Sequence, residues 1–530
     1  MTPASDPTHP AGPSAATPDP GSTGAAKDSA EEALRRSLAA QNLGDFAAML
    51  AAAEHAWKLD PDHPDTALRL AECRLFCSDV AGAIRLLGER EKAAGHDVAQ
   101  LLRIAERYTQ CARHTDALRC ARRAADQAPG NPQSLYNLAA ACIAAGEIHE
   151  AETLLTEVIR LNPRDYDAWY NRSTLRRRST ADNHIDELRY VLAHLDPDEA
   201  GLVPVCYALA RELEDLERHD EAFDYLQRGA QARRRRLSYQ VEDDLETLRQ
   251  ITNTFDAARM AQAPALESPG CPVFVIGLPR SGTTLVDRII GTHSQATSLG
   301  EINMLAYGVM HAVSETTGGA QNTAEPGAPG SDPARSKPGF VAASSGIDMA
   351  RLGARYRQAL QGFGENTPRL VDKTPLNGLY LGLIRLALPE ARIIHVRRHP
   401  VDSCLAMYKT LFRMGYPFSY RLQDVGRYVI GWHRLMDHWR EVAGDGLLDV
   451  DYENLVGDPE AETRRVLDFL GLPFEAGCLR FHESTAPAAT ASAAQVREPI
   501  HSRSVGLWRR YARQLGPLAA RLKEHGLEFD

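Results

Sequence analysis

The stretch Val273-Phe-Val-Ile-Gly-Leu-Pro-Arg-Ser-Gly-Thr-Thr-Leu285 determines how the C-terminal half of the chain folds. Its first four residues are apolar and predict a buried strand, and Gly277 with the proline that follows predicts a turn. From Gly282 onward an amphipathic pattern predicts a helix. A strand, a glycine-bearing loop and a helix N-terminus aim backbone N–H groups at one point, which is the geometry of a phosphate site. The loop also carries a forked cation, Arg280, which suits oxyanions.

The spacing of the two glycines matches a Walker A loop, but Thr283 stands where that loop has its lysine. The lysine normally reaches the β- and γ-phosphates, so its absence argues against ATP or GTP hydrolysis and favours another phosphorylated donor. Ser281 and Thr284 add two more hydroxyl groups to the loop. The alternative is a glycine-rich turn without a ligand, but one cation and three hydroxyls in so short a loop favour the phosphate site.

Short apolar stretches alternate with helical patterns downstream of this loop and predict a parallel, doubly wound, P-loop-like α/β domain. The predicted strands follow the opening strand at 297–301, 369–375, 392–397 and 447–452. Ligands of such sheets bind at the carboxyl ends of the strands. Glu301 and Lys373 lie at the carboxyl ends of two of these strands, and Arg398 directly follows a third. Residues 314–346 are rich in Gly, Ala, Ser and Pro and predict a flexible insertion.

The N-terminal half has a helical repeat. Pro129, Pro163 and Pro197 each close a helical run and recur every 34 residues, the period of the tetratricopeptide repeat. The pattern therefore resembles tetratricopeptide repeats, with two clear units and about four degenerate ones, and predicts an α-solenoid over 29–265. Such solenoids commonly bind peptides, although a scaffold without a partner stays an alternative. Residues 1–28 contain few large apolar side chains and predict a disordered tail, which leaves 266–530 for the α/β domain.

Composition excludes several classes of protein. At 530 residues the chain requires more than one domain. A net charge of −10 argues against general nucleic-acid binding. No apolar run predicts a membrane span, and the first residues do not resemble a secretory signal. Nine scattered cysteines without further metal-ligand spacing predict reduced thiols in a cytoplasmic protein and no metal site.

Five motifs, in this order, give the C-terminal half a family resemblance. They are Gly277-Leu-Pro-Arg-Ser-Gly-Thr-Thr284, Leu299-Gly-Glu301, Asp372-Lys-Thr-Pro375, His395-Val-Arg-Arg-His-Pro-Val-Asp402 and Asp451-Tyr-Glu-Asn-Leu455. Together they resemble the sulfotransferase family, whose donor is 3′-phosphoadenosine-5′-phosphosulfate. Within it, Glu301 and the segment from Asp372 to Pro375 look most like protein-tyrosine sulfotransferases and their bacterial relatives fused to tetratricopeptide repeats.

The resemblance implies a role for each matched residue. Glu301 corresponds to the proposed general base, and Lys373 and Ser492 to groups that stabilise the transferring sulfuryl group, as Arg280 also would. The expected donor site comprises Arg280, Ser281, Gly282, Thr283, Thr284, Arg398, Ser403, Tyr452, Ser492, Gln495 and Arg497. Residues 492–501 would close over the donor.

Two positions depart from the family pattern. The family usually has serine eight residues after the arginine that binds the 3′-phosphate, and this chain has Ala406 there. Ser403, one helical turn earlier, is the expected substitute. Leu507 stands where a lysine is expected near the end of the C-terminal segment. Both departures concern contacts to the nucleotide and not the transfer itself.

The leading hypothesis is transfer of a sulfuryl group to tyrosine in a protein, with the solenoid binding the substrate or another protein. The same enzyme acting on a small phenol or a sugar hydroxyl is the first alternative. A nucleotide kinase or NTPase is disfavoured by Thr283, and a non-catalytic adaptor by the intact Arg280, Glu301 and Lys373. The repeats are expected to serve substrate choice, so that a chain beginning near residue 262 would still bind the donor.

Overall fold

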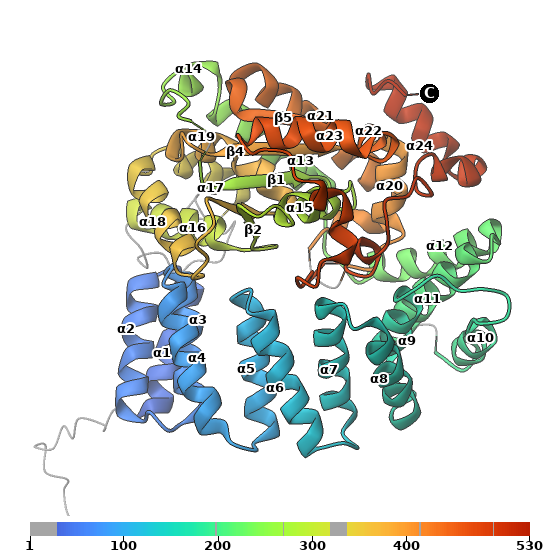
Figure 1. The fold of residues 1–530 in the computed structure, drawn as a ribbon, viewed down its shortest axis with the longest axis horizontal. Coiled ribbons are helices and arrows are strands. Elements are labelled where there is room, and N and C mark those ends of the chain that lie inside the picture. Colours follow the sequence, from blue (N-terminus) through green and yellow to red (C-terminus); the bar gives the residue numbers. More distant parts are fainter. Residues whose placement is uncertain are drawn as a thin grey trace, which may run out of the picture.

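The computed structural model describes residues 29–196, 199–268, 270–317, 336–412, 415–490 and 492–529. The predicted tail, 1–28, therefore lies outside the described residues. An array of helical hairpins runs beneath an α/β domain (Figure 1). Within the described ranges, every helix is too short or too polar to cross a membrane.

The N-terminal array consists of helices joined in antiparallel pairs, as the 34-residue period predicts. They are α1 (Ala30–Leu43), α2 (Phe46–Leu59), α3 (Pro64–Phe76), α4 (Val80–Ala94), α5 (Val98–Gln110), α6 (His114–Gln127), α7 (Pro132–Ala145), α8 (Ile148–Leu161), α9 (Tyr166–Thr174), α10 (Ile185–Ala193), α11 (Leu202–Asp215) and α12 (His219–Arg235). Ala121 and Ala139 are buried between neighbouring helices, where a small side chain permits close approach. Gly146 ends α7 with φ of 88°, a left-handed conformation that favours glycine.

Two further helices, α13 (Val241–Thr254) and α14 (Ala257–Met260), connect the array to the α/β domain. Leu248 and Ile251 of α13 are buried. The predicted boundary between residues 265 and 266 falls between α14 and the first strand.

Five parallel strands form the sheet, which confirms the predicted fold class. They are β1 (Val273–Gly277), β2 (Ala296–Ser298), β3 (Arg369–Asp372), β4 (Arg392–Arg397) and β5 (Leu447–Asp451). Their order is β2-β3-β1-β4-β5, so the chain moves to one side of β1 and then crosses to the other. The loop after β1 therefore lies at the point where the strand order reverses, which is where ligands bind in such sheets.

Helices cover both faces of the sheet. They are α15 (Thr283–Gly291), α16 (Met304–Thr317), α17 (Lys337–Ser344), α18 (Met349–Gln361), α19 (Leu381–Ala387), α20 (Pro400–Tyr408), α21 (Leu422–Val442), α22 (Tyr452–Gly457), α23 (Pro459–Phe469) and α24 (Ala512–Glu524). Helices α16 and α17 occupy both ends of the predicted insertion at 314–346. Those ends are therefore helical, although Ser344 is the one buried residue among the positions of α16 and α17 that fall inside the predicted insertion. Residues 318–335 lie outside the described residues.

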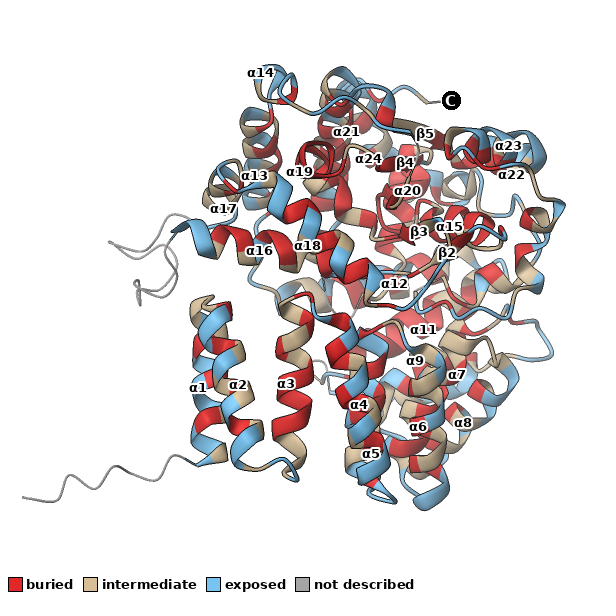
Figure 2. Ribbon diagram, turned by 60° about the vertical axis from the view of Figure 1, so that its left-hand side comes forward, coloured by how far each residue is buried: buried red, intermediate tan, exposed pale blue. Residues whose placement is uncertain are grey.

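Alternate side chains of β1 enter two different cores. Val273 and Val275 pack with α15, α22 and α23, whereas Phe274 and Ile276 face α18, α19 and α21. The second core continues without a break into the helical array. Figure 2 shows β4 and α20 as buried ribbon at the centre of the domain, while the outer helices α1 and α2 alternate between buried and exposed residues.

Polar contacts also join the two halves. The hydroxyl of Tyr207 in α11 donates to the carbonyl oxygen of Tyr408 at 3.2 Å. Glu214 of the same helix accepts from Lys409 at 2.6 Å and from the Tyr511 hydroxyl at 2.7 Å. Although burial opposes it, the charge of Lys409 contributes to lowering the pKa of Glu214. The array and the α/β domain thus share a core and buried hydrogen bonds.

Candidate active site

Left-handed backbone conformations shape the loop between β1 and α15. Gly277, Arg280 and Gly282 have φ of 157°, 67° and 108°. A Cβ atom on Gly282 would lie 2.6 Å from the ring of Tyr452, so glycine is required for this ring to pack on the loop. Arg280 adopts its left-handed conformation without being glycine, and such strain is concentrated at binding sites.

The hydroxyl groups of the loop are buried at the start of α15. Ser281, Thr283 and Thr284 are 1%, 3% and 7% exposed. Thr284 Oγ1 lies 3.4 Å from Thr490 Oγ1, whereas the Ser281 hydroxyl has no hydrogen-bond partner among the described residues. A buried hydroxyl without a partner is costly. An oxyanion at the start of α15 would accept hydrogen bonds from the Ser281 hydroxyl and from the first backbone N–H groups of the helix.

Arg280 brings the loop together with the C-terminal segment. Its Nη1 donates to Ser492 Oγ, and its Nη2 donates to Gln495 Oε1 at 2.7 Å. Its Nε has no partner, and Arg280 forms no ion pair with a carboxylate among the described residues. Burial, with a smaller contribution from the charge of nearby Arg398, lowers the pKa of Arg280 to about 10. A cation in this position favours an anionic ligand, because an uncompensated buried charge is costly.

Arg398 lies behind the loop, held by backbone carbonyls. Its Nη1 donates to the Arg280 carbonyl at 3.0 Å and its Nη2 to the Ser504 carbonyl at 2.7 Å. The guanidinium carbon is 5.0 Å from the centre of the Tyr452 ring, whose hydroxyl lies 2.8 Å from Ser504 Oγ. Ser403 is 1% exposed, and its hydroxyl donates to the Arg398 carbonyl at 3.4 Å. Arg398 and Ser403, both expected to bind the 3′-phosphate, thus lie together behind the loop, and the Nε of Arg398 has no hydrogen-bond partner among the described residues.

The start of α20 fastens the end of the chain to this site. Asp402 accepts the backbone N–H of Gly506 at 2.7 Å and that of Trp508 at 2.9 Å. The carboxylate thus does not pair with Arg398, although the two are one helical turn apart. Leu507, where the family pattern has lysine, lies between the two anchored residues.

Lys373 and Glu301 meet at the carboxyl ends of β3 and β2. Lys373 Nζ lies 2.5 Å from Glu301 Oε1; the lysine side chain is 0% exposed and the glutamate 41%. Next to them Asp372 accepts from the Tyr356 hydroxyl at 2.8 Å and from Thr374 Oγ1 at 2.7 Å. Burial raises the pKa of Asp372 to about 7, while these hydrogen bonds oppose the rise. A buried ammonium and a half-exposed carboxylate thus share one hydrogen bond at the edge of the site.

Arg497, expected to help close the C-terminal segment over the donor, contacts backbone carbonyls in this structure. Its Nη1 donates to the Ser484 carbonyl, and its Nη2 to the carbonyls of Ala486 at 2.8 Å and Ala145 at 3.2 Å. Ala145 ends α7 of the helical array. The Arg497 guanidinium therefore holds the C-terminal segment against α7, and its expected contact with the donor stays a prediction.

A second contact fixes the same segment. The Ala488 N–H donates to the Ala144 carbonyl of α7 at 2.7 Å. In Figure 1 the dark red chain before α24 descends toward α7. The segment that carries Ser492 and Gln495 is thus held on one side by Arg280 and on the other by the helical array.

A cavity of about 690 Å³ lies between the array and the α/β domain. We call it the interdomain chamber. Helices α5, α6 and α7 form one wall. The opposite wall contains five of the residues expected in the site: Arg280, Thr283, Thr284, Glu301 and Ser492. The chamber therefore unites the loop, the carboxylate and the C-terminal segment.

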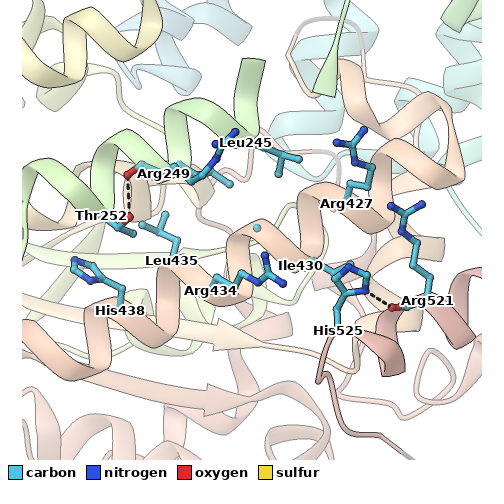
Figure 3. A pocket seen from close by; sticks show the side chains of 12 residues that line it. Leu245, Arg249, Thr252, Arg427, Ile430, Arg434, Leu435, His438, Arg521 and His525 are labelled. Carbon is cyan, nitrogen blue, oxygen red and sulfur yellow. Dashed lines mark hydrogen bonds between the residues drawn. The ribbon is translucent and has the colours of Figure 1, made fainter. Parts of the chain in front are cut away.

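A second groove, of about 570 Å³, lies between α13, α21 and α24 (Figure 3). Leucine and isoleucine side chains alternate there with four arginines, Arg249, Arg427, Arg434 and Arg521, and two histidines. None of the expected site residues and no carboxylate lines it. The groove thus has histidines but no carboxylate, and the interdomain chamber, which contains Glu301 and the loop after β1, is the candidate site.

The histidines of the α/β domain have structural contacts. His395 Nδ1 lies 2.7 Å from Asp449, and burial lowers its pKa. His293 Nε2 lies 2.8 Å from the Pro473 carbonyl. Neither residue lines the interdomain chamber, so neither competes with Glu301 for the role of base.

Several contacts could not be read from the sequence. Thr490 and Ser504 approach the loop and Arg398 from a segment that carries no regular pattern. Phe412 and Tyr416 line the chamber with ring centres 4.7 Å apart. The wall formed by the helical array has no sequence signal either, since it arises from the packing of two distant halves.

Comparisons with known proteins agree with the division of the chain into a helical array and an α/β domain. Residues 272–476 match the sulfotransferase family, and residues 112–171 match the tetratricopeptide repeat. An uncharacterized protein of Aquifex aeolicus is 26% identical over 416 residues, which cover 76% of this chain and 52% of that protein. A putative protein-tyrosine sulfotransferase of Caenorhabditis briggsae is 25% identical over 248 residues, 44% of this chain and 80% of that protein.

A third relative has a different name. The omega-hydroxy-beta-dihydromenaquinone-9 sulfotransferase Stf3 of Mycobacterium bovis is 29% identical over 126 residues, 22% of this chain and 32% of that protein. The chain spans about half the length of the Aquifex protein and about a third of the length of Stf3. By its motifs and these matches, the chain is similar to the sulfotransferase family over residues 272–476 and to tetratricopeptide repeats over residues 112–171.

Proposed function

We propose that this protein transfers a sulfuryl group from 3′-phosphoadenosine-5′-phosphosulfate to a hydroxyl group in the interdomain chamber. The observation that carries the proposal is Arg280, a partly buried cation without a carboxylate partner among the described residues. It lies in a loop that also buries the unpartnered hydroxyl of Ser281. The residues present fit the donor, because both groups require an oxyanion at the start of α15.

The residues around the chamber would divide the work of transfer. The bond between sulfur and the oxygen bridging to the nucleotide breaks, and a bond from sulfur to the acceptor oxygen forms. Glu301 takes the acceptor's proton, while Lys373 and Arg280 stabilise the charge that develops on the departing oxygen and the sulfuryl group. The Ser492 hydroxyl, whose oxygen accepts from Arg280, donates a hydrogen bond to an oxygen of the sulfuryl group. The nucleotide leaves as 3′-phosphoadenosine-5′-phosphate, so charge and atoms balance without an oxidant or reductant.

For the acceptor we propose tyrosine in a protein. A phenol, with pKa about 10, gives up its proton more readily than an alcohol. Phe412 and Tyr416 line the chamber with Glu301, and their rings offer faces and edges for another aromatic ring. The putative protein-tyrosine sulfotransferase of Caenorhabditis briggsae supports this acceptor, whereas the name of Stf3 supports a hydroxyl compound that is not a protein as the alternative. The nine unpaired thiols support a cytoplasmic location.

Donor binding tests the proposal first. Calorimetry should show that 3′-phosphoadenosine-5′-phosphate binds more tightly than ATP, because Thr283 stands where an NTPase has lysine. Incubation of the sulfated donor with tyrosine peptides should then add the mass of one sulfuryl group. Equal or tighter binding of ATP, together with no sulfuryl adduct on any hydroxyl acceptor, would contradict the proposed function.

A further inference from the structure

The wall that the helical array contributes to the interdomain chamber is built mainly from small side chains. Six alanines of α5, α6 and α7 line it: Ala105, Ala117, Ala121, Ala140, Ala141 and Ala144. Of these, Ala140 is exposed to the chamber. Small side chains keep this wall away from Glu301 and leave room for a ligand longer than the ring that is modified.

Charge is sparse on this wall. Apart from Arg280 and Glu301, which belong to the transfer site, Glu106 and His114 are the acidic or basic side chains that line the chamber. Burial lowers the pKa of His114, so the imidazole is neutral near pH 7. Among the described residues, the array thus places no cation on the chamber wall, and its one fixed charge is negative.

Glu106 is available to a ligand. Its side chain is 66% exposed and lies 3.7 Å from Arg107, which itself donates to Gln110 and lies near Glu72. Its carboxylate is therefore weakly paired. A basic residue near the acceptor hydroxyl would gain a partner here, while an acidic one would be repelled.

Uncharged polar groups complete the wall. Asn137 lines the chamber and has no hydrogen-bond partner among the described residues. Thr109 and Gln110 lie on the neighbouring helix α5. An amide side chain offers a donor and an acceptor together, which matches the N–H and C=O of a peptide backbone.

We propose that the acceptor is a protein segment laid against α5–α7, neutral or basic around the target hydroxyl, with Glu106 selecting against acidic neighbours. The inference rests on the proposed sulfotransferase activity and adds the chemistry of the substrate to it. The array is thereby one wall of the acceptor site, and not a separate docking module.

Matched peptides test the inference. We would measure kcat and KM for short synthetic peptides with one tyrosine flanked by alanine, lysine or aspartate residues, and for free 4-methylphenol. The full-length protein should give the lowest KM for the lysine peptide and the highest for the aspartate peptide. Glu106→Lys should reverse this order, changing each KM by roughly two- to fivefold, the range for a half-exposed ion pair. Added salt should shrink the differences.

A second test places a large side chain in the chamber and measures KM for the peptides. Ala140→Trp should raise KM for every peptide by about tenfold or more and leave the affinity for 3′-phosphoadenosine-5′-phosphate unchanged. The controls are Glu89→Lys and Ala99→Trp, at exposed positions of α4 and α5 that do not line the chamber.

The outcomes separate the two proposals. Sulfation that ignores flanking charge, or that survives Ala140→Trp with its KM unchanged, overturns this inference and leaves the sulfotransferase activity standing. The same holds if 4-methylphenol reacts as efficiently as the best peptide. Absence of sulfation on all acceptors, with no preference for the nucleotide over ATP, overturns the activity itself.

Discussion

Lys373 and Glu301 form an ion pair with unequal exposure, and that asymmetry bears on catalysis. The lysine is fully buried, whereas the glutamate is 41% exposed and lines the interdomain chamber. The buried ammonium therefore depends on this carboxylate for its counter-charge. A donor sulfuryl group would bring negative charge to Lys373 and release Glu301 to accept a proton from the acceptor.

Replacing this carboxylate separates the two roles. Glu301→Gln keeps the size of the side chain and removes the proton acceptor, so turnover should fall by roughly 10²–10⁴-fold. Binding of 3′-phosphoadenosine-5′-phosphate should persist, because the nucleotide supplies negative charge to Lys373. Steady-state kinetics and calorimetry measure the two effects, and Glu301→Asp, which keeps the charge, should retain more activity. Undiminished turnover in Glu301→Gln would assign the base elsewhere.

Asp372 gives the site a predictable pH dependence of stability. Its pKa is raised to about 7 by burial, so between about pH 4 and pH 7 the folded protein holds a proton that the unfolded chain has lost. This group therefore lowers the free energy of unfolding as pH rises through that window. Asp372→Asn removes the effect, and the thermal midpoint of the wild type should fall relative to the variant between pH 5 and pH 8. A constant difference between the two midpoints would contradict the raised pKa.

At the scale of elements, the C-terminal segment links the helical array to the donor loop. Arg497 binds the carbonyls of Ser484 and Ala486 within the segment and that of Ala145 in α7. The segment in turn presents Ser492 and Gln495 to Arg280. Arg497 is thus expected to influence donor binding indirectly, by holding the segment whose Ser492 and Gln495 contact Arg280.

Removal of this guanidinium should loosen the segment. Arg497→Ala should weaken donor binding by about tenfold or more, since hydrogen bonds from a charged group contribute about 1.5–3 kcal/mol. The KM for the acceptor should change less, because Glu301 and the wall of α5–α7 stay in place. Arg480→Ala is the matched control, an exposed arginine whose nearest carboxylate is Glu483 at 3.5 Å. Donor affinity equal in the two variants would exclude the positioning role.

These elements also mark how far the sequence could predict the structure. Apolar runs and glycine spacing predicted all five strands and placed Arg280, Glu301 and Lys373 at one edge, because local patterns and parallel topology determine those positions. The contacts of Arg497 could not be predicted, since its partners are backbone carbonyls from α7 and a loop, which no residue type in the sequence marks. The ends of the predicted insertion were misread because small residues in α17 resemble loop composition.

The whole molecule behaves as one packed unit, which changes an expectation drawn from the sequence. A chain beginning near residue 262 was expected to bind the donor alone. Such a chain would lack Glu214, the partner of the buried Lys409, and the α7 carbonyls that hold the C-terminal segment. It would also expose a core that is continuous between the two halves. These contacts now favour loss of donor binding.

Coupling between the halves can be tested without removing either. Gly146 and Gly44 both end helices of the array in left-handed conformations, with φ of 88° and 76°. A Cβ atom on Gly146 would lie 2.6 Å from the Arg497 guanidinium, whereas nothing lies within 4 Å of one on Gly44. Both Gly→Ala substitutions strain the backbone similarly and should lower the thermal midpoint by similar amounts.

Only Gly146→Ala should also displace Arg497, and it should therefore weaken the binding of 3′-phosphoadenosine-5′-phosphate. Calorimetry on the two full-length variants measures the difference. Matched thermal midpoints with a severalfold loss of affinity confined to Gly146→Ala would demonstrate that the end of α7 positions the donor segment. Equal affinities would mean that the array touches this segment without influencing the site, and that a partner bound to the array could not reach the donor by this route.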